Sequence, residues 1–175
     1  MEKILIVVDI QKDFVDGSLG TPEAQAIIKN AANKIKNFDG TIYVTYDTHS
    51  EDYMETAEGK NLPVPHCIEG TDGWELNCDI AKALMDKGYI AVKKPTFGSI
   101  DLPQMIADNH NTDAMEIELI GLCTDICVIS NALLLKANFP EIKISVDKNC
   151  CAGVTPEKHN AALDVMASCQ IHRGE

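Results

Sequence analysis

The stretch "KILIVVD" (residues 3–9) brings five apolar residues in a row to an aspartate. A run of this length, rich in β-branched residues, is typical of a strand that is buried on both faces of a parallel sheet. It is not typical of a signal peptide, because no basic segment precedes it and it ends at a charge. The first strand of the fold is therefore predicted here, with Asp9 at its carboxyl end.

Similar runs recur along the chain and alternate with stretches of helical length. The predicted strands are residues 3–9, 41–47, 89–94, 116–122 and 141–147, with 169–172 as a candidate last edge strand. The predicted helices are residues 22–38, 74–88, 101–109, 124–139 and 155–168. Such alternation implies a three-layer α/β/α fold with a central parallel sheet of five or six strands. We expect residues 1–175 to form a single domain.

The composition excludes several classes of protein. Of the 175 residues, 45% are hydrophobic and 24% are charged, which is the mix of a soluble globular domain. The net charge of −12 would repel a phosphate backbone, so nucleic acid is not expected as a partner. No stretch approaches the roughly 20 apolar residues that span a bilayer, so we expect no membrane association and a cytoplasmic location. The oligomeric state stays open, a homo-oligomer included.

Reactive side chains stand where the predicted strands end. In parallel α/β folds the carboxyl ends of the strands form the binding edge, and the long irregular stretch 48–73 is expected to contribute to it. The residues at these ends are Asp9, Asp47, Lys93, Lys94 and Cys123, with Cys127 just beyond.

Cys127 is expected in the first turn of the helix that follows Cys123. The positive end of the helix and a nearby lysine would stabilise a thiolate and lower the pKa of the thiol. An aspartate beside the thiol could remove its proton and later return it to a leaving group. Backbone N–H groups of Cys123 and Cys127 could bind a developing oxyanion. The set therefore suits attack on an amide carbonyl through a thioester.

A simpler alternative gives these side chains no chemistry. Lys93 and Lys94 could be solvated charges at a strand end, whereas Asp9 would be partly buried, where an unpaired carboxylate is costly. Most cysteines act as small buried hydrophobes. We expect that role for Cys78, Cys150, Cys151 and Cys169.

A second group of residues could bind a metal. Asp47 and His49 stand two residues apart at a predicted strand end, and His66 returns from the long loop. One carboxylate and two imidazoles suit Zn²⁺, Fe²⁺ or Mn²⁺, and three protein ligands leave positions open for water or substrate. Surface histidines and a turn aspartate are the alternative interpretation of this pattern.

Taken together, the ordered motifs resemble those of the cysteine hydrolase (isochorismatase-like) superfamily, most closely its nicotinamidase/pyrazinamidase branch. The resemblance spans nearly the whole chain and implies an isochorismatase-like (Rossmann-like) hydrolase fold. The motifs are "VVDIQKDF" (7–14), "DTH" (47–49), "PHCIEGTDGWEL" (65–76), "KKPTFGS" (93–99) and "GLCTDICV" (121–128).

The resemblance assigns roles to individual residues. It implies a catalytic triad of Asp9, Lys94 and Cys127, with Lys94 preferred to Lys93 because it lies three residues before Phe97. It places Cys123 and Cys127 at the oxyanion hole through their backbone N–H groups, often after a cis peptide bond. It also implies a divalent transition metal, most simply zinc, at the aspartate and two histidines named above, and it gives Phe14 a contact with the substrate ring.

Some positions depart from the family pattern. Pro63 stands where many nicotinamidases have a tryptophan that stacks on the substrate, and Trp74 is expected to pack in the following helix. The fourth metal ligand is open among Ser50, Glu51, Glu58 and water. The resemblance implies hydrolysis of nicotinamide to nicotinate and ammonia. Alternatives are another small amide, such as a ureido or carbamoyl compound, or a non-catalytic homologue. A Rossmann nucleotide binder is disfavoured because no GxGxxG follows the first strand.

Overall fold

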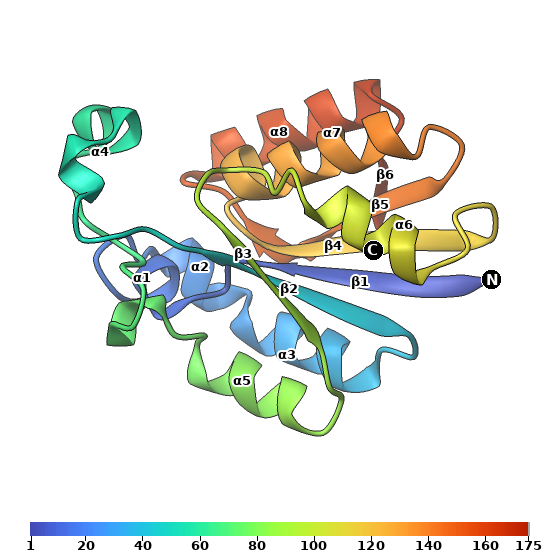
Figure 1. Cartoon of the computed structure of the whole chain (residues 1–175), viewed down its shortest axis with the longest axis horizontal. Helices are drawn as coiled ribbons and strands as arrows, with labels where there is room; N and C mark the ends of the chain where they lie inside the picture. Colours follow the sequence, from blue (N-terminus) through green and yellow to red (C-terminus); the bar gives the residue numbers. More distant parts are fainter. Residues whose placement is uncertain (175) are drawn as a thin grey trace.

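The computed structural model describes residues 1–174, and within them six strands form one parallel sheet in the order β3-β2-β1-β4-β5-β6 (Figure 1). The predicted α/β fold with a central parallel sheet is confirmed. The short edge strand lies a few residues beyond the predicted 169–172. The strands are β1 Glu2–Val8, β2 Thr41–Asp47, β3 Ile90–Lys94, β4 Met115–Leu122, β5 Lys143–Ala152 and β6 His172–Gly174.

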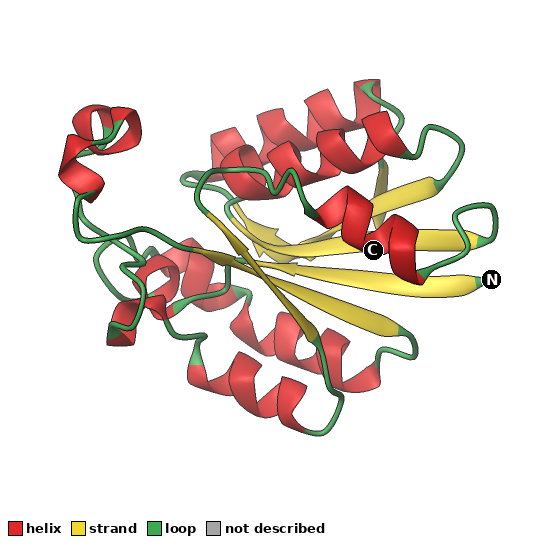
Figure 2. Cartoon of the chain, in the orientation of Figure 1, coloured by secondary structure: helices red, strands yellow, loops and turns green. Residues whose placement is uncertain are grey.

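Helices cover both faces of the sheet (Figure 2). One face carries α2 Pro22–Ala26, α3 Ile28–Asn37 and α5 Cys78–Met85, and the other carries α6 Leu102–Asn109, α7 Ile129–Asn138 and α8 Pro156–Ser168. Strand β1 contributes to both hydrophobic cores, with Ile4, Ile6 and Val8 on one side and Leu5 and Val7 on the other. Its run is apolar at every position because neither face meets water.

Three predicted helices differ from the structure in their boundaries. Residues 22–38 form two helices, and the break between them lets the adjacent Ile27 and Ile28 both reach the core. The helix predicted at 74–88 begins only at Cys78, because the side chain of Asn77 caps it by accepting a hydrogen bond from the backbone of Asp79. The helix predicted at 124–139 opens with a wide π-turn, η3 Thr124–Val128, before α7.

The long stretch between β2 and α5 contains short helices that the sequence did not predict. They are η1 Tyr53–Glu55, α4 Ala57–Asn61 and η2 Asp72–Trp74. Thr56 starts α4 by accepting a hydrogen bond from the backbone N–H of Gly59. A further four-residue helix, α1 Lys12–Val15, follows β1. Helices this short leave no clear apolar periodicity, so a sequence pattern does not reveal them.

The four cysteines that were predicted to be buried differ in their exposure. Strand β5 runs five residues past its predicted end, so Cys150 and Cys151 lie within it and are buried as expected. The prediction of burial is wrong for Cys78 and Cys169, which are exposed because they stand at the ends of α5 and α8. Among the helices of the described residues, none is long and apolar enough to cross a membrane.

Candidate active site and metal centre

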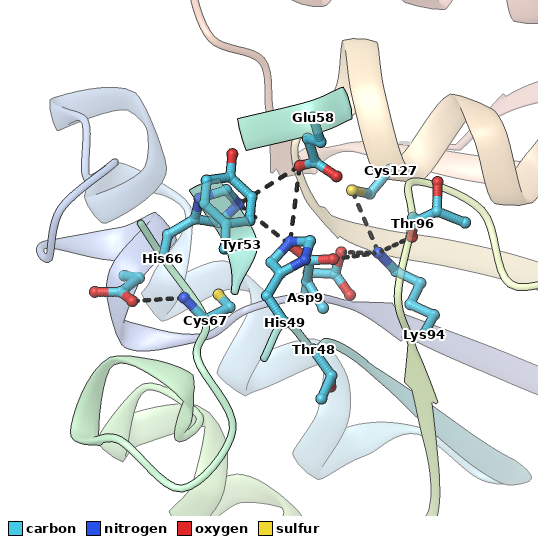
Figure 3. Close-up of polar contacts among 12 residues, drawn as sticks. Asp9, Thr48, His49, Tyr53, Glu58, His66, Cys67, Lys94, Thr96 and Cys127 are labelled. Atoms are coloured by element: carbon cyan, nitrogen blue, oxygen red, sulfur yellow. Dashed lines mark hydrogen bonds and ion pairs between the residues drawn. The ribbon is translucent and has the colours of Figure 1, made fainter. Parts of the chain in front are cut away.

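Lys94 is the centre of a buried polar cluster at the carboxyl edge of the sheet (Figure 3). It ends β3, and 1% of its surface is exposed. Its ammonium lies 2.6 Å from Oδ2 of Asp9 and 3.4 Å from Sγ of Cys127, and it donates a hydrogen bond to the carbonyl of Thr96. The structure thus brings the three residues of the predicted triad together. Neighbouring Lys93 lies outside, exposed and paired with Glu69.

Asp9 follows β1 directly, with a φ of 47° that turns its carboxylate toward this cluster. It is completely buried and accepts a hydrogen bond of 2.6 Å from the hydroxyl of Thr45. Burial raises the pKa of Asp9 above its ordinary value, although the charge of Lys94 acts against this. For Lys94 burial acts to lower the pKa, but the attraction of Asp9, Cys127 and Asp47 outweighs it and raises the pKa. The cluster therefore retains a protonated lysine beside a carboxyl group that is suited to accept a proton.

Cys127 lies in η3, buried, with its sulfur directed at Lys94 (Figure 3). Burial raises the pKa of this thiol well above its ordinary value, and the negative charge of Asp9 adds to the effect, while Lys94 acts to lower it. The expectation of a lowered pKa is therefore wrong. Loss of water around the sulfur outweighs the helix terminus and the lysine. A thiol whose pKa is raised in this way needs a base before it can act as a nucleophile.

The turn before Cys127 is shaped by close packing of β4 on β1. The peptide bond between Leu122 and Cys123 is cis, as expected from the resemblance. Gly121 has a φ of 123°, and a Cβ there would lie 2.1 Å from the carbonyl oxygen of Val8. Only glycine allows the two strands to approach so closely just before Asp9 and Cys123. Both cysteines of the turn, Cys123 and Cys127, line the same cavity.

Beside the triad, four side chains converge as a metal-binding group. Asp47, His49, Glu58 and His66 each present one ligand atom, and these atoms all lie within 4.8 Å of one another. Oδ2 of Asp47 lies 3.0 Å from Nε2 of His49 and 3.4 Å from Nε2 of His66. Oε1 of Glu58 lies 3.7 and 3.8 Å from the same two nitrogens. Oxygen and imidazole ligands of zinc stand about 2.0–2.2 Å from the ion, so donors at these separations fit around one ion.

The surroundings of this group favour metal binding. Nδ1 of His66 lies 2.8 Å from the carbonyl of Val64, and because a carbonyl only accepts, Nδ1 carries a hydrogen. Nε2 is the nitrogen that faces Asp47, and it could ligate an ion in place of donating a hydrogen bond to that carboxylate. Burial would raise the pKa of Asp47, but hydrogen bonds with His49 and His66 and the charge of Lys94 hold it below the ordinary range. Asp47 is therefore a carboxylate, as a ligand must be.

Of the candidates for a fourth ligand, Glu58 is the one whose side chain the structure brings to the other three. It stands on α4, and the hydrogen bond from the hydroxyl of Tyr53 to the carbonyl of Leu62 holds this helix over the histidines. Ser50 and Glu51 are exposed and do not belong to the group. The sequence names Glu58 as a candidate but does not show the path of the loop that brings it to Asp47 and the two histidines.

A cavity of about 300 Å³ lies between the thiol and the metal-binding group. Phe14, which was predicted to contact a substrate ring, forms part of the cavity wall, and its ring lies 5.4 Å from that of His66. Several other wall residues, such as Leu19, Leu62 and Ile126, were not predicted, although Phe97 belongs to a quoted motif. The full lining is Phe14, Leu19, Thr21, Asp47, Glu58, Leu62, His66, Phe97, Cys123, Ile126, Cys127, Val154 and Lys158.

Trp74 is not part of this wall. It stands in η2, not in the following helix as expected, and its indole N–H donates a hydrogen bond of 3.0 Å to the hydroxyl of Thr48. Its ring packs against the ring of Tyr46, and the ammonium of Lys93 lies over the ring of Trp74. Leu62, the residue before Pro63, lines the cavity, whereas Pro63 and Trp74 do not.

A parallel sheet covered on both faces, with a thiol, a lysine and a carboxylate at its carboxyl edge, defines a hydrolase of the cysteine hydrolase superfamily. Residues 3–173 match the family model for the isochorismatase domain. The chain belongs to the isochorismatase domain family.

Curated relatives match nearly the whole chain. An uncharacterized isochorismatase family protein of Bacillus subtilis, PncA, is 29% identical over 96% of each chain. The nicotinamidase/pyrazinamidase of Mycobacterium tuberculosis is 25% identical over 97% of this chain and 96% of its own. Among solved structures, nicotinamidase PncA from Bacillus subtilis superposes with a TM-score of 0.87 at 26% identity and covers 100% of both chains.

Proposed function

We propose that this protein is a nicotinamidase-like amidohydrolase that converts nicotinamide to nicotinate and ammonia. The observation that carries the proposal is the single small cavity that has the Cys127 thiol on one side and His66 with its metal-binding partners on the other. A carboxamide on a nitrogen-containing ring presents one group to each side. The names of the relatives support the same substrate class.

The proposed chemistry begins with transfer of the Cys127 proton to Asp9, whose raised pKa suits a base. The sulfur attacks the carboxamide carbon, and the backbone N–H groups of Cys123 and Cys127 hold the oxyanion. Asp9 returns the proton to the nitrogen, the C–N bond breaks and ammonia leaves a thioester on Cys127. A water molecule, deprotonated by Asp9, then attacks the thioester carbon. The C–S bond breaks, Asp9 returns the proton to the sulfur of Cys127, and the acid product leaves and ionises. Lys94 keeps the charges of Asp9 and the thiolate compensated throughout.

Asp47, His49, His66 and Glu58 are the residues that would hold the metal. A donor set of two imidazoles and two carboxylates suits Zn²⁺, with Fe²⁺ and Mn²⁺ as the other candidates. A bound ion would supply a Lewis-acidic position to orient a ring nitrogen. Phe14 provides an apolar contact for the ring beside His66.

Another small amide, such as a ureido or carbamoyl compound, is the second candidate substrate. It is favoured by the cavity wall, because none of the described residues that line it is tryptophan and Leu62 occupies that side. A leucine provides apolar contact but no flat surface for an aromatic ring. This candidate keeps the triad and the thioester and changes only the group that enters the cavity.

The test is ammonia release from nicotinamide, benzamide and a set of ureido and carbamoyl compounds, with and without a metal chelator. Metal content is measured on the same preparations. We expect about one transition-metal ion per chain, a preference for nicotinamide over benzamide, which lacks the ring nitrogen, and loss of that preference on chelation. If benzamide is hydrolysed as well as nicotinamide, or the metal-free protein is fully active, metal-anchored ring binding fails and the small-amide candidate leads.

A further inference from the structure

Gln11 is a buried amide that does not line the cavity and yet uses most of its hydrogen-bonding capacity. It lies between Asp9 and α1, and none of its surface is exposed. Its Nε2 donates to the carbonyl of Asp47 at 2.9 Å and to the carbonyl of Trp74 at 2.8 Å. Its Oε1 accepts from the backbone N–H of Asp47 at 2.8 Å. Both backbone polar groups of a metal-binding residue are thus held by one side chain.

Asp13, two residues further on, holds the other side of the same group. Its Oδ2 accepts a hydrogen bond of 2.8 Å from the backbone N–H of Cys67, the residue after His66. Cys67 has a φ of 47°, so the chain makes a tight turn at the point where Asp13 holds it. The carboxylate of Asp13 is itself packed on Gly73, where a Cβ would lie 2.2 Å from Oδ2.

Neither side chain belongs to the group of four that could ligate a metal ion. Both donor hydrogens of the Gln11 amide are already used on backbone carbonyls. Asp13 likewise has its Oδ2 engaged by the chain beside His66. Their contacts fix where the backbone of Asp47 and His66 runs, and the backbone sets where the ligand atoms stand.

We propose that Gln11 and Asp13 are positioning residues for the metal centre, a role that rests on the metal site of the proposed function. Gln11 positions the backbone of Asp47, and Asp13 positions the chain beside His66. The segment that directly follows the proposed base, Asp9, therefore also positions the metal-binding residues. Outer residues of this kind contribute about 10–100-fold to metal affinity in characterised sites. Because Gly73 lies in η2, its contact with Asp13 also ties η2 to this segment.

The test measures metal affinity without any substrate. Zn²⁺ is titrated into the metal-free wild-type chain, Gln11→Met and Asp13→Ala in competition with a chromogenic chelator, and Co²⁺ absorption reports the ligand geometry. We expect about a 10–100-fold weaker Kd in each variant, with an altered Co²⁺ spectrum. The thermal midpoints of the metal-free proteins are recorded alongside.

Asn131→Leu is the matched control for Gln11→Met. Asn131 is also a buried amide with three backbone partners, Ser99, Phe97 and Cys127, but it contacts none of the metal-binding residues. Its loss should lower the thermal midpoint while leaving the Kd for Zn²⁺ within about threefold of wild type, a change of less than 1 kcal/mol.

Gly73→Ala provides a second test of the Asp13 contact. The added methyl group should displace the carboxylate of Asp13 and weaken Zn²⁺ binding in the wild type, but have little further effect when Asp13 is already alanine. The proposal is overturned if Gln11→Met and Asp13→Ala lower stability like Asn131→Leu but bind Zn²⁺ as tightly as wild type, or if the wild type binds no transition metal. Tight metal binding without nicotinamide hydrolysis would instead contradict the proposed substrate and leave this inference standing.

Discussion

Replacement of Lys94 by methionine should destabilise the protein strongly and in a pH-dependent way. The ammonium lies 2.6 Å from Asp9, and both side chains are fully buried. At an effective dielectric constant of about 20, two unit charges at 2.6 Å attract each other by about 6 kcal/mol. Part of this attraction is offset by the cost of burying the charges, so removal of one partner from such a pair typically costs about 3–5 kcal/mol. We expect a loss of that size in the free energy of unfolding of Lys94→Met at pH 8.

The loss should shrink as the pH falls. Burial already raises the pKa of Asp9, and Lys94 is the group that acts to lower it, so the variant raises the folded-state pKa further. Between the pKa of an unfolded aspartate, about 4, and the raised folded-state value, the folded variant binds a proton that the unfolded chain does not. The stability contributed by this protonation is fully present below the unfolded pKa and is lost as the pH rises through the folded pKa.

The assay is urea unfolding at pH 5 and pH 8 in the presence of a chelator. The double variant Lys94→Met, Asp9→Asn removes both charges and should regain about 2 kcal/mol relative to Lys94→Met at pH 8. Lys93→Met is the control, because this neighbouring lysine is exposed and its ion pair with Glu69 is worth less than about 1 kcal/mol. Equal destabilisation by Lys94→Met at both pH values, with no recovery in the double variant, would refute a charged Asp9 beside Lys94.

Other predictions concern the thiol, the base and the fourth ligand. Cys127→Ala should abolish ammonia release with an unchanged circular dichroism spectrum, whereas Cys123→Ala should retain most of it because only a backbone N–H is used. Loss of activity in Cys123→Ala but not in Cys127→Ala would mean that the nucleophile has been assigned to the wrong thiol. Asp9→Asn should lower kcat by at least 100-fold, the usual contribution of a general base, and a loss under threefold would remove Asp9 from the mechanism. Glu58→Gln should weaken Zn²⁺ binding in a chelator competition, and an unchanged Kd would leave water as the fourth ligand.

Two regularities predicted that the strand-end residues would meet, and the resemblance then selected Asp9, Lys94 and Cys127 among them. Apolar runs mark the strands, and parallel strands bring their carboxyl ends to one edge. Asp9 and Lys94 end or follow such runs directly, and Cys127 lies in the turn after β4. The choice of Lys94 over Lys93 needed the motif, since alternation along a strand places one of two adjacent side chains inside but does not say which.

Features that depend on the path of a loop or on burial could not be predicted in the same way. Glu58 is eleven residues from Asp47 along the chain, and its place is set by the cap at Thr56 and by the contact of Tyr53 with Leu62. The pKa of Cys127 was predicted in the wrong direction because a helix start and a lysine can be recognised in a sequence, whereas the loss of water around a sulfur cannot. The sequence had already assigned removal of the thiol proton to an aspartate, and burial of the sulfur makes that step essential in the proposed mechanism. If Cys127 were a resting thiolate, Asp9 would be needed only to protonate the leaving nitrogen, but a buried thiol requires Asp9 as a base before any bond is made. Burial of the cluster thus makes the carboxylate necessary for the first step as well as the second.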